Sequence, residues 1–272
     1  MSESPPTADL HLHTTASDGI LTVGDLPTAA DVAGLNLIAV TDHDVIHPKI
    51  PAPVVALDSL TVVRGIELRV ETPTEQIDLL GYAVSRTDAL ETELDRIQQN
   101  RIDRGAEIIE SVESYLDIDL DIEPRTGLGR PHIARAIDAS DAPYDVERAF
   151  DELIGNNGPC FVPRAVTSLE AGVELLTEAC AVVSLAHPFR YEDPAAALEL
   201  TSALDGVERY YPYGFAVDTG RVDALIEAHG LLATGGSDAH GETLGHAGLS
   251  GAKADTFRSA LPKAERYTRL GA

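Results

Sequence analysis

The chain has 272 residues, 44% hydrophobic and 24% charged, which suits one large globular domain or one domain with an insertion. Forty-five acidic residues against twenty basic ones give a formal net charge of −25. This excess of acids excludes an extended basic surface for nucleic acid, so a nucleic-acid substrate would have to be held by the active site itself. No apolar run approaches the length of about 20 residues that spans a bilayer, so we expect no membrane partner.

The charge also bears on the habitat of the protein. Self-repulsion at this charge density weakens a compact fold in dilute buffer, whereas molar salt shortens the Debye length to about 3 Å and screens it. We therefore favour a halophilic origin, although an acidic protein from an ordinary cytoplasm has the same composition.

The two cysteines do not make a disulfide framework, and the N-terminus lacks the pattern of a signal peptide, so we expect a cytoplasmic protein.

Short apolar runs that end in polar side chains recur along the chain and predict buried strands, at residues 8–12, 36–40, 61–66, 77–83, 181–186, 207–211 and 231–233. Amphipathic segments between many of them predict helices at residues 25–35, 168–180, 194–204 and 219–229. The second of these helices is expected to begin with a capping box formed by Thr167 and Glu170. Alternating strands and helices favour parallel strands with right-handed crossovers, and hence a β/α barrel with its site at the carboxyl ends of the strands.

The middle of the chain has few strand signals. A long amphipathic helix is expected at 87–115, broken near Gly105, followed by a helix that begins at Pro131 and another at 144–154. We interpret residues 87–164 as a helical insertion or cap between the two parts of the barrel, residues 1–86 and 165–272.

Metal-binding side chains follow the predicted strands. His11 and His13 are two apart, so in a strand both rings face the same side, about 6–7 Å apart along the strand. Asp18 follows in Ser17-Asp18-Gly19, a sequence typical of a turn. Taken alone, a His-x-His pair at a strand end is more often a pair of unrelated polar residues than a metal site.

Similar groups follow the later strands: Asp42 with His43, Glu67, His187, and Asp238 with His240. Each group alone is compatible with a solvated turn or a helix cap. Together they place five histidines and several carboxylates at one end of successive strands, which is rare by chance because unpaired polar groups in a barrel mouth are costly. Mixed imidazole and carboxylate ligands suit zinc, manganese or iron.

These motifs resemble the polymerase-and-histidinol-phosphatase (PHP) superfamily. The matching segments run in the family's order over most of the chain: His11-Leu12-His13, Asp18, Thr41-Asp42-His43, Gly65-Ile66-Glu67, Leu80-Gly81-Tyr82, His187-Pro188 and Asp238-x-His240. The resemblance implies an α/β fold, a distorted seven-stranded β/α (TIM-like) barrel with two or three divalent metal ions.

Carried over motif by motif, the resemblance implies three ligand sets. One metal would be held by His11, His13, Glu67 and Asp238. A second would be held by Glu67, His187 and Asp78, and a third by Asp18, His43 and His240. Relatives usually have a histidine where this chain has Asp78, so the second site is expected to be weaker or to prefer manganese or magnesium over zinc.

The inserted region favours one branch of the superfamily. Its segment His132-Ile133-Ala134-Arg135 resembles that of the nucleotide-phosphatase and 5′-3′ exonuclease-like proteins, and Arg190 fits the same group. On a helix, His132 and Arg135 are three residues apart and can point at one phosphate, although an ordinary surface helix has the same spacing. Arg190 could add a bidentate contact.

The resemblance implies a metal-dependent phosphoesterase in which a metal-bound hydroxide attacks phosphorus. The expected substrate is a small phosphorylated molecule, a nucleotide or the 5′ end of a short nucleic acid. We expect Asp42, His43 and Glu67 to be catalytic, with His132, Arg135 and Arg190 binding the phosphate. The alternatives are a histidinol phosphatase, which shares the metal motifs, and a non-catalytic PHP-type binding module, which would be expected to lack ligands.

Overall fold

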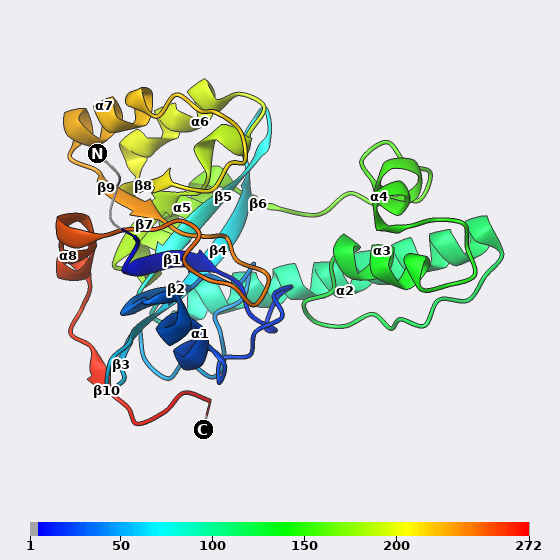
Figure 1. Ribbon diagram of the computed structural model, residues 1–272. Coiled ribbons are helices and arrows are strands. Elements are labelled where there is room, and N and C mark those ends of the chain that lie inside the picture. Colours follow the sequence, from blue (N-terminus) through cyan, green and yellow to red (C-terminus); the bar gives the residue numbers. More distant parts are fainter. Residues whose placement is uncertain (1–4, 272) are drawn as a thin grey trace. The chain divides into compact units, whose positions relative to one another are not determined.

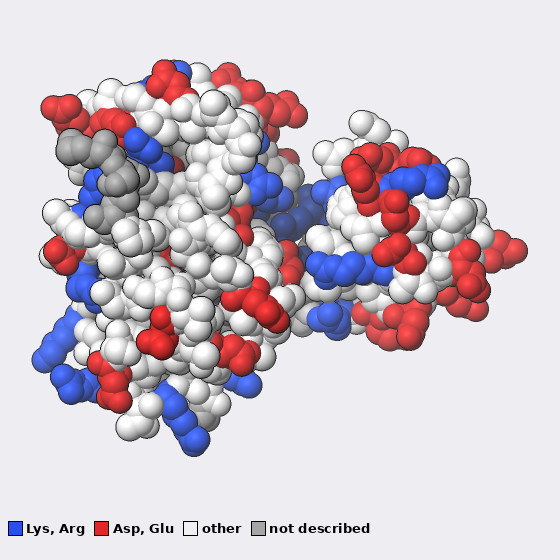
Figure 2. Space-filling view, in the orientation of Figure 1, with Lys and Arg blue, Asp and Glu red and all other residues white. Residues whose placement is uncertain are grey.

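The computed structural model describes residues 5–271, which fold as two compact units (Figure 1). The first unit consists of the residues up to Glu91 together with those from Thr167 onward, and the second is Thr92–Val166. On the face shown in Figure 2, acidic side chains are spread over both units. No helix within residues 5–271 combines the length and apolar character needed to cross a membrane.

Seven strands follow one another through the main sheet of the first unit: β1 (Ala8–Leu12), β2 (Leu37–Val40), β4 (Thr61–Glu71), β5 (Gln76–Tyr82), β7 (Val182–Leu185), β8 (Gly206–Tyr210) and β9 (Leu232–Gly235). After β9 the chain returns to β1, because Ala239 forms a parallel bridge with Leu12 and its carbonyl accepts a hydrogen bond from His13 N at 2.9 Å. The ring of strands is therefore nearly closed, and the predicted seven-stranded α/β barrel is confirmed.

Three short strands lie off this path. β3 (Val54–Ala56) and β6 (Thr167–Ser168) pair with β4, and β10 (Glu265–Arg266) pairs with β3.

The expectation that all barrel strands are parallel is wrong for β5, which is antiparallel to both β4 and β7. Only residues 72–75 connect β4 to β5, and so short a connection makes a hairpin because a parallel crossover needs a dozen or more residues. The strand β4 also continues five residues beyond its predicted end, so Glu67 lies inside a strand rather than after one. As a result, Asp78 near the start of β5 lies opposite Arg69 near the end of β4.

Five α-helices lie wholly within the described residues of the first unit: α1 (Leu26–Ala33), α5 (Leu169–Ala179), α6 (Pro194–Glu199), α7 (Gly220–His229) and α8 (Gly251–Ala260). In Figure 1, α6 and α7 lie on one side of the strands and α1 on another. The helix α1 is followed by Gly34, whose φ of 71° is the left-handed conformation that stops a helix. The capping box expected from Thr167 and Glu170 is wrong: Ser168 caps α5 by accepting from Ala171 N at 3.3 Å, and Thr167 belongs to β6.

The alternation of side chains along β1 separates the core from the site. Leu10 and Leu12 pack into two apolar clusters with residues of the neighbouring strands and helices. The residues between and beside them, Asp9, His11 and His13, are equally buried but are polar. Because successive side chains of a strand face opposite sides, these three residues share the other face of β1.

The second unit is helical and has its own apolar core, contributed among others by Ile108, Val112, Ile133 and Leu153. Its helices are the continuous α2 (Asp88–Leu116), which begins in the first unit, α3 (Arg130–Asp138), α4 (Val146–Ala149) and a π-helical turn (Phe150–Ile154). The predicted break near Gly105 is wrong. A Cβ at Gly105 would lie 2.4 Å from Leu128 Cδ2, so this glycine permits close packing without interrupting the helix.

Candidate metal centre

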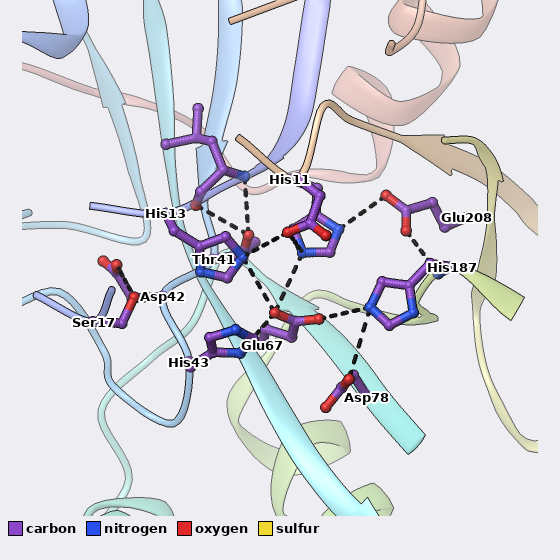
Figure 3. A network of polar contacts seen from close by, with 12 residues as sticks. His11, His13, Ser17, Thr41, Asp42, His43, Glu67, Asp78, His187 and Glu208 are labelled. Carbon is purple, nitrogen blue, oxygen red and sulfur yellow. Dashed lines mark hydrogen bonds and ion pairs between the residues drawn. The ribbon is translucent and has the colours of Figure 1, made fainter. Parts of the chain in front are cut away.

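The first group of converging side chains consists of His11, His13, Glu67 and Asp238, whose ligand atoms lie within 4.8 Å of one another. The ring of His13 places Nε2 3.1 Å from Asp238 Oδ1 and 3.3 Å from Glu67 Oε2. His11 Nε2 lies 3.4 Å from the same oxygen of Glu67. These contacts join β1, β4 and the segment after β9 at one end of the barrel, and Figure 3 shows the two imidazoles beside Glu67.

A second group contains His13, Asp18, His43 and His240. Asp18 Oδ1 lies 3.3 Å from His240 Nε2, and the rings of His13 and His240 stack with their centroids 4.2 Å apart. His43 follows β2, and its Nδ1 lies 2.8 Å from Glu67 Oε2. The set predicted from Asp18, His43 and His240 is thus brought together, with His13 as an additional member that it shares with the first group.

A third group consists of Glu67, Asp78 and His187. His187 Nε2 lies 3.0 Å from Glu67 Oε1 and 3.7 Å from Asp78 Oδ2. Glu67 therefore uses Oε1 toward this group and Oε2 toward the other two, as Figure 3 shows. One carboxylate inside β4 connects all three groups.

The backbone is strained where two of these residues enter the site. His187 has a φ of 25° and Asp238 a φ of 50°, conformations that side chains other than glycine rarely adopt. Close approach of β9 and β1 also requires Gly236, because a Cβ there would lie 2.2 Å from His11 N. Backbone strain of this kind is concentrated at functional sites, where the surrounding structure maintains it.

Opposite charges dominate the protonation of the centre. Burial lowers the pKa of His13, but its close contacts with Asp238 and Glu67 outweigh burial and raise the pKa to about 10. Burial raises the pKa of Glu67, but the charges of His43 and His11 hold it well below its usual range. The pKa of Asp238 is likewise lowered, because His11 and His13 outweigh burial. Without metal, protonated imidazoles balance the carboxylates, and metal binding must displace those protons.

The donor atoms of the first two groups fit metal ions. Several buried atoms have no hydrogen-bond partner among the described residues: His11 Nε2, His13 Nδ1 and Nε2, Asp18 Oδ1 and Glu67 Oε2. Buried polar atoms without partners are costly, and a cation coordinated by imidazole nitrogens and carboxylate oxygens would satisfy them together.

Several known proteins are similar to this chain in sequence, and others in fold. The chain is 26% identical over 263 residues to the 3′,5′-nucleoside bisphosphate phosphatase of Chromobacterium violaceum, covering 88% of this chain and 90% of the relative. It is 26% identical over 247 residues to the 5′-3′ exoribonuclease Rnm of Escherichia coli, covering 85% and 84%. A solved structure from Bifidobacterium adolescentis, described as a metal-dependent phosphoesterase, shares the fold with a TM-score of 0.78 at 22% identity over 96% of this chain and 99% of its own. No protein-family model matches the sequence.

The names of these relatives and the shared fold support the resemblance of this chain to the PHP superfamily. The resemblance inferred from its motifs is therefore confirmed.

One residue of the site that sequence reasoning missed is Glu208, on β8. It is fully buried, accepts from His11 Nδ1 at 3.1 Å and accepts from His187 N at 2.7 Å. Its only signal in the sequence is a glutamate within the predicted strand 207–211, between Val207 and Arg209. Glu208 thus fixes the ring of one candidate ligand and the strained backbone of another.

Asp9 was also missed. It is buried on the polar face of β1, and burial raises its pKa although it accepts several hydrogen bonds. The donors are the amides of Ser237 (2.9 Å) and Gly245 (2.9 Å) and the hydroxyl of Ser237 (2.5 Å). Asp9 therefore holds the loop that carries Asp238 against β1.

Asp42 lies apart from the three groups (Figure 3). Its carboxylate accepts from Thr14 N at 2.7 Å, Thr14 Oγ1 at 2.8 Å and Ser17 Oγ at 2.7 Å. These bonds shape the loop between His13 and Asp18. A catalytic role for Asp42 stays a prediction, and the contacts indicate a structural one.

Arg190 lies at the edge of the centre, with 54% of its side chain exposed. Its Nη1 donates to Tyr211 Oη at 2.7 Å and to Asp238 Oδ2 at 3.2 Å. His132 and Arg135 belong to α3 of the second unit, where Gly129 N donates to His132 Nδ1 at 3.2 Å and Arg135 is exposed. Phosphate binding by these three residues stays a prediction.

The remaining histidines expected outside the site are His47, His229 and His246, and none of them is in the three groups. His47 is buried, which lowers its pKa, and its Nδ1 accepts from Lys49 N at 3.1 Å. His229 is exposed at the end of α7.

Proposed function

We propose that this protein is a metal-dependent phosphoesterase that hydrolyses phosphate esters of nucleotides or of 5′-phosphorylated oligonucleotide ends. The observation that carries the proposal is the convergence of imidazoles and carboxylates on Glu67, with buried donor atoms that lack other partners. The names of the relatives, a nucleoside bisphosphate phosphatase and an exoribonuclease, support the same class of reaction and substrate.

The first two ligand groups would each hold one metal ion for this reaction. His11, His13, Glu67 and Asp238 would hold one ion, and Asp18, His43 and His240, with His13, another. Divalent ions bound there supply Lewis-acid chemistry: they polarise the phosphoryl group and activate water as the nucleophile. Manganese, zinc, iron and magnesium all accept ligands from this set of donors.

Arg190 is suited to binding the phosphate. Its guanidinium lies in the same cavity as His43, Glu67 and His240, and much of it faces solvent. A guanidinium can donate two parallel hydrogen bonds to a phosphate, which orients the ester as well as attracting it. Arg190 would thereby stabilise the negative charge that grows on the phosphoryl oxygens in the transition state.

Aromatic side chains near Arg190 favour a nucleotide over a simple sugar phosphate. The ring of Tyr211 lies 4.7 Å from that of Tyr213, which in turn lies 5.4 Å from Phe189 and 5.7 Å from Phe215. Phe215 is 60% exposed, unusual for a large apolar side chain. Rings of this kind provide stacking surfaces for bases, and stacking tolerates different base identities.

We further propose that the helical region, residues 87–164, acts as a cap that selects the substrate. Three of its arginines lie close enough to affect a fourth: burial, together with the charges of Arg130, Arg164 and Arg101, lowers the pKa of Arg104 to about 10. In a chain with only twenty basic residues, such a group favours an anionic ligand. His132 and Arg135 of the same unit would add contacts to phosphate.

The net charge of −25 and the small number of cysteines lead us to propose a cytoplasm of high salt concentration as the site of action. The assay conditions should match this environment.

A substrate screen tests the function. The metal-stripped protein is assayed in molar potassium chloride with manganese, zinc or magnesium added singly. Substrates are nucleoside monophosphates, nucleoside 3′,5′-bisphosphates, short 5′-phosphorylated oligonucleotides and histidinol phosphate. We expect metal-dependent release of phosphate or nucleotides from the nucleotide substrates. Preference for histidinol phosphate would contradict the substrate class, and no hydrolysis of any ester with any metal would contradict the enzyme itself.

A further inference from the structure

The third group of ligands contains a cation of the protein itself. Arg69 Nε donates to Asp78 Oδ1 at 2.8 Å and Arg69 Nη2 donates to Asp78 Oδ2 at 2.7 Å. The two residues lie directly opposite each other in the antiparallel pair of β4 and β5. The sheet register therefore holds this bidentate ion pair in place, and only 3% of the Asp78 side chain is exposed.

The ion pair uses the carboxylate that a third metal ion would need. Asp78 Oδ2, which bonds Arg69 Nη2, is the oxygen that lies 3.7 Å from His187 Nε2. A metal ion between Asp78 and His187 would share this oxygen with a guanidinium. Like charges at such short range repel strongly, all the more in a buried site where water screens them poorly.

The third group has little net negative charge with which to attract a divalent ion. The charge of Asp78 is balanced by Arg69, and Glu67 also belongs to the first group. His187 contributes an imidazole, which is neutral when it binds metal. The donor set Glu67, Asp78 and His187 therefore does not fit a divalent ion as the other two sets do.

The first group provides a contrast within the same structure. Arg190 also contacts a ligand of that group, but it reaches only Asp238 Oδ2, at 3.2 Å. The other oxygen, Oδ1, remains directed at His13 at 3.1 Å and His11 at 3.5 Å. A metal ion can use that oxygen without displacing an arginine.

We propose that the guanidinium of Arg69 serves as the fixed cation of the third group, so that the centre binds two divalent ions and not three. The inference rests on the proposed function only in requiring that the first two groups bind metal. Arg69 lines the same cavity as Arg190, with 37% of its side chain exposed. It supplies positive charge on that side of the site at every metal concentration.

Counting bound ions tests the inference without an activity assay. The folded protein is dialysed to equilibrium against increasing manganese, and the manganese content per chain is measured by mass spectrometry. We expect the wild type to saturate at two ions per chain. Arg69→Gln frees Asp78 and is expected to bind a third ion at least tenfold more tightly than the wild type does.

Arg209→Gln is a matched control. Arg209 also forms a bidentate pair with an aspartate, donating to both oxygens of Asp223 at 2.6 and 3.0 Å, but neither residue belongs to a ligand group. Its manganese content should stay at two ions per chain. A second variant, Arg69→Ser combined with Asp78→His, replaces the ion pair by a neutral ligand and is expected to bind three ions.

The possible counts lead to different conclusions. Three ions bound by the wild type with similar affinities would overturn the inference but leave the proposed function intact. Two ions bound by both Arg69→Gln and the double variant, with circular dichroism showing folded protein, would also overturn it. If Arg69→Gln does not fold, the count for the double variant decides. No uptake of manganese by the wild type would overturn the proposed function, and the inference with it.

Discussion

Glu208 holds the imidazole of His11 in position through a buried hydrogen bond of 3.1 Å from Nδ1 to Oε1. This bond fixes the orientation of the ring and leaves Nε2 directed at Glu67 Oε2 and Asp238 Oδ1, at 3.4 and 3.5 Å. The second oxygen of Glu208 accepts from the amide of His187 at 2.7 Å. One side chain on β8 therefore positions two candidate ligands that lie 176 residues apart in the chain.

Replacing Glu208 should weaken metal binding more than it weakens the fold. Groups that orient metal-binding histidines typically change metal affinity about 10–100-fold when they are removed. We expect Glu208→Ala to raise the dissociation constant for manganese by about that factor, measured by calorimetry. Glu208→Gln retains one oxygen, so its dissociation constant should lie between those of Glu208→Ala and the wild type. An affinity unchanged in Glu208→Ala would contradict the positioning role.

Removing His11 tests the first group directly. His11→Ala deletes a fully buried ligand, so we expect loss of at least one bound ion per chain and of phosphoesterase activity, with the barrel still folded. The metal content of the purified variant and its circular dichroism spectrum are the measurements. His229→Ala, at the exposed end of α7, is the control and should keep both metal and activity. Full metal content together with full turnover in His11→Ala would refute the assignment.

Much of this centre could be predicted because its ligands occur in compact motifs at strand ends. His11-Leu12-His13 and Asp238-Ala239-His240 each place two ligands on one segment, and strand periodicity gives the common side of His11 and His13. Glu67 was also recognised, although the strand that carries it proved longer than its apolar run suggested. The structure brings these residues together as expected.

The residues that sequence reasoning missed act through contacts between distant strands. Glu208 on β8 meets His11 on β1, and Asp9 meets Ser237, with no local pattern to mark either pair. Arg69 and Asp78 pair because β5 runs antiparallel to β4. The alternation of strands and helices predicted that β5 runs parallel to β4. The connection between these two strands is too short for a parallel crossover, so they form a hairpin.

The pH dependence of stability should differ between the metal-free and metal-loaded forms. The pKa of His13 is about 10 in the metal-free fold, above the value of about 6.5 expected in the unfolded chain. Its contribution to the free energy of unfolding is therefore complete below about pH 6.5 and is lost as the pH rises toward 10. Glu67 and Asp238, whose pKa values are lowered in the fold, add to the free energy of unfolding above about pH 4.5, and this contribution is lost in acid.

We accordingly expect the metal-free protein to melt at a lower temperature at pH 9 than at pH 6. The metal-loaded protein should not show this loss, because metal affinity rises with pH as the imidazoles lose their protons. Thermal melting followed by circular dichroism, with and without a chelator, is the measurement. Equal melting temperatures for the metal-free protein at pH 6 and pH 9 would show that the imidazole–carboxylate contacts do not stabilise it.

Salt should stabilise this protein. Its net charge of −25 produces self-repulsion that salt screens, since the Debye length falls from about 10 Å at 0.1 M to about 3 Å at 1 M. We expect the melting temperature to rise between 0.1 and 2 M potassium chloride. Chloride is preferred over sulfate because sulfate also strengthens apolar burial. A melting temperature that is flat or falls with potassium chloride would contradict adaptation to high salt.

Tyr213 provides the test of base recognition, because its ring lies between those of Tyr211 and Phe215 and beside Phe189. A base stacked on an aromatic ring gains about 1–3 kcal/mol, so Tyr213→Ala should raise KM for nucleotide substrates roughly 5- to 150-fold. Glycerol phosphate has no base, and its kcat/KM should not change. Tyr213→Phe keeps the ring and should behave as the wild type. If Tyr213→Ala impairs both substrates equally, the ring supports the loop that carries it and does not bind a base.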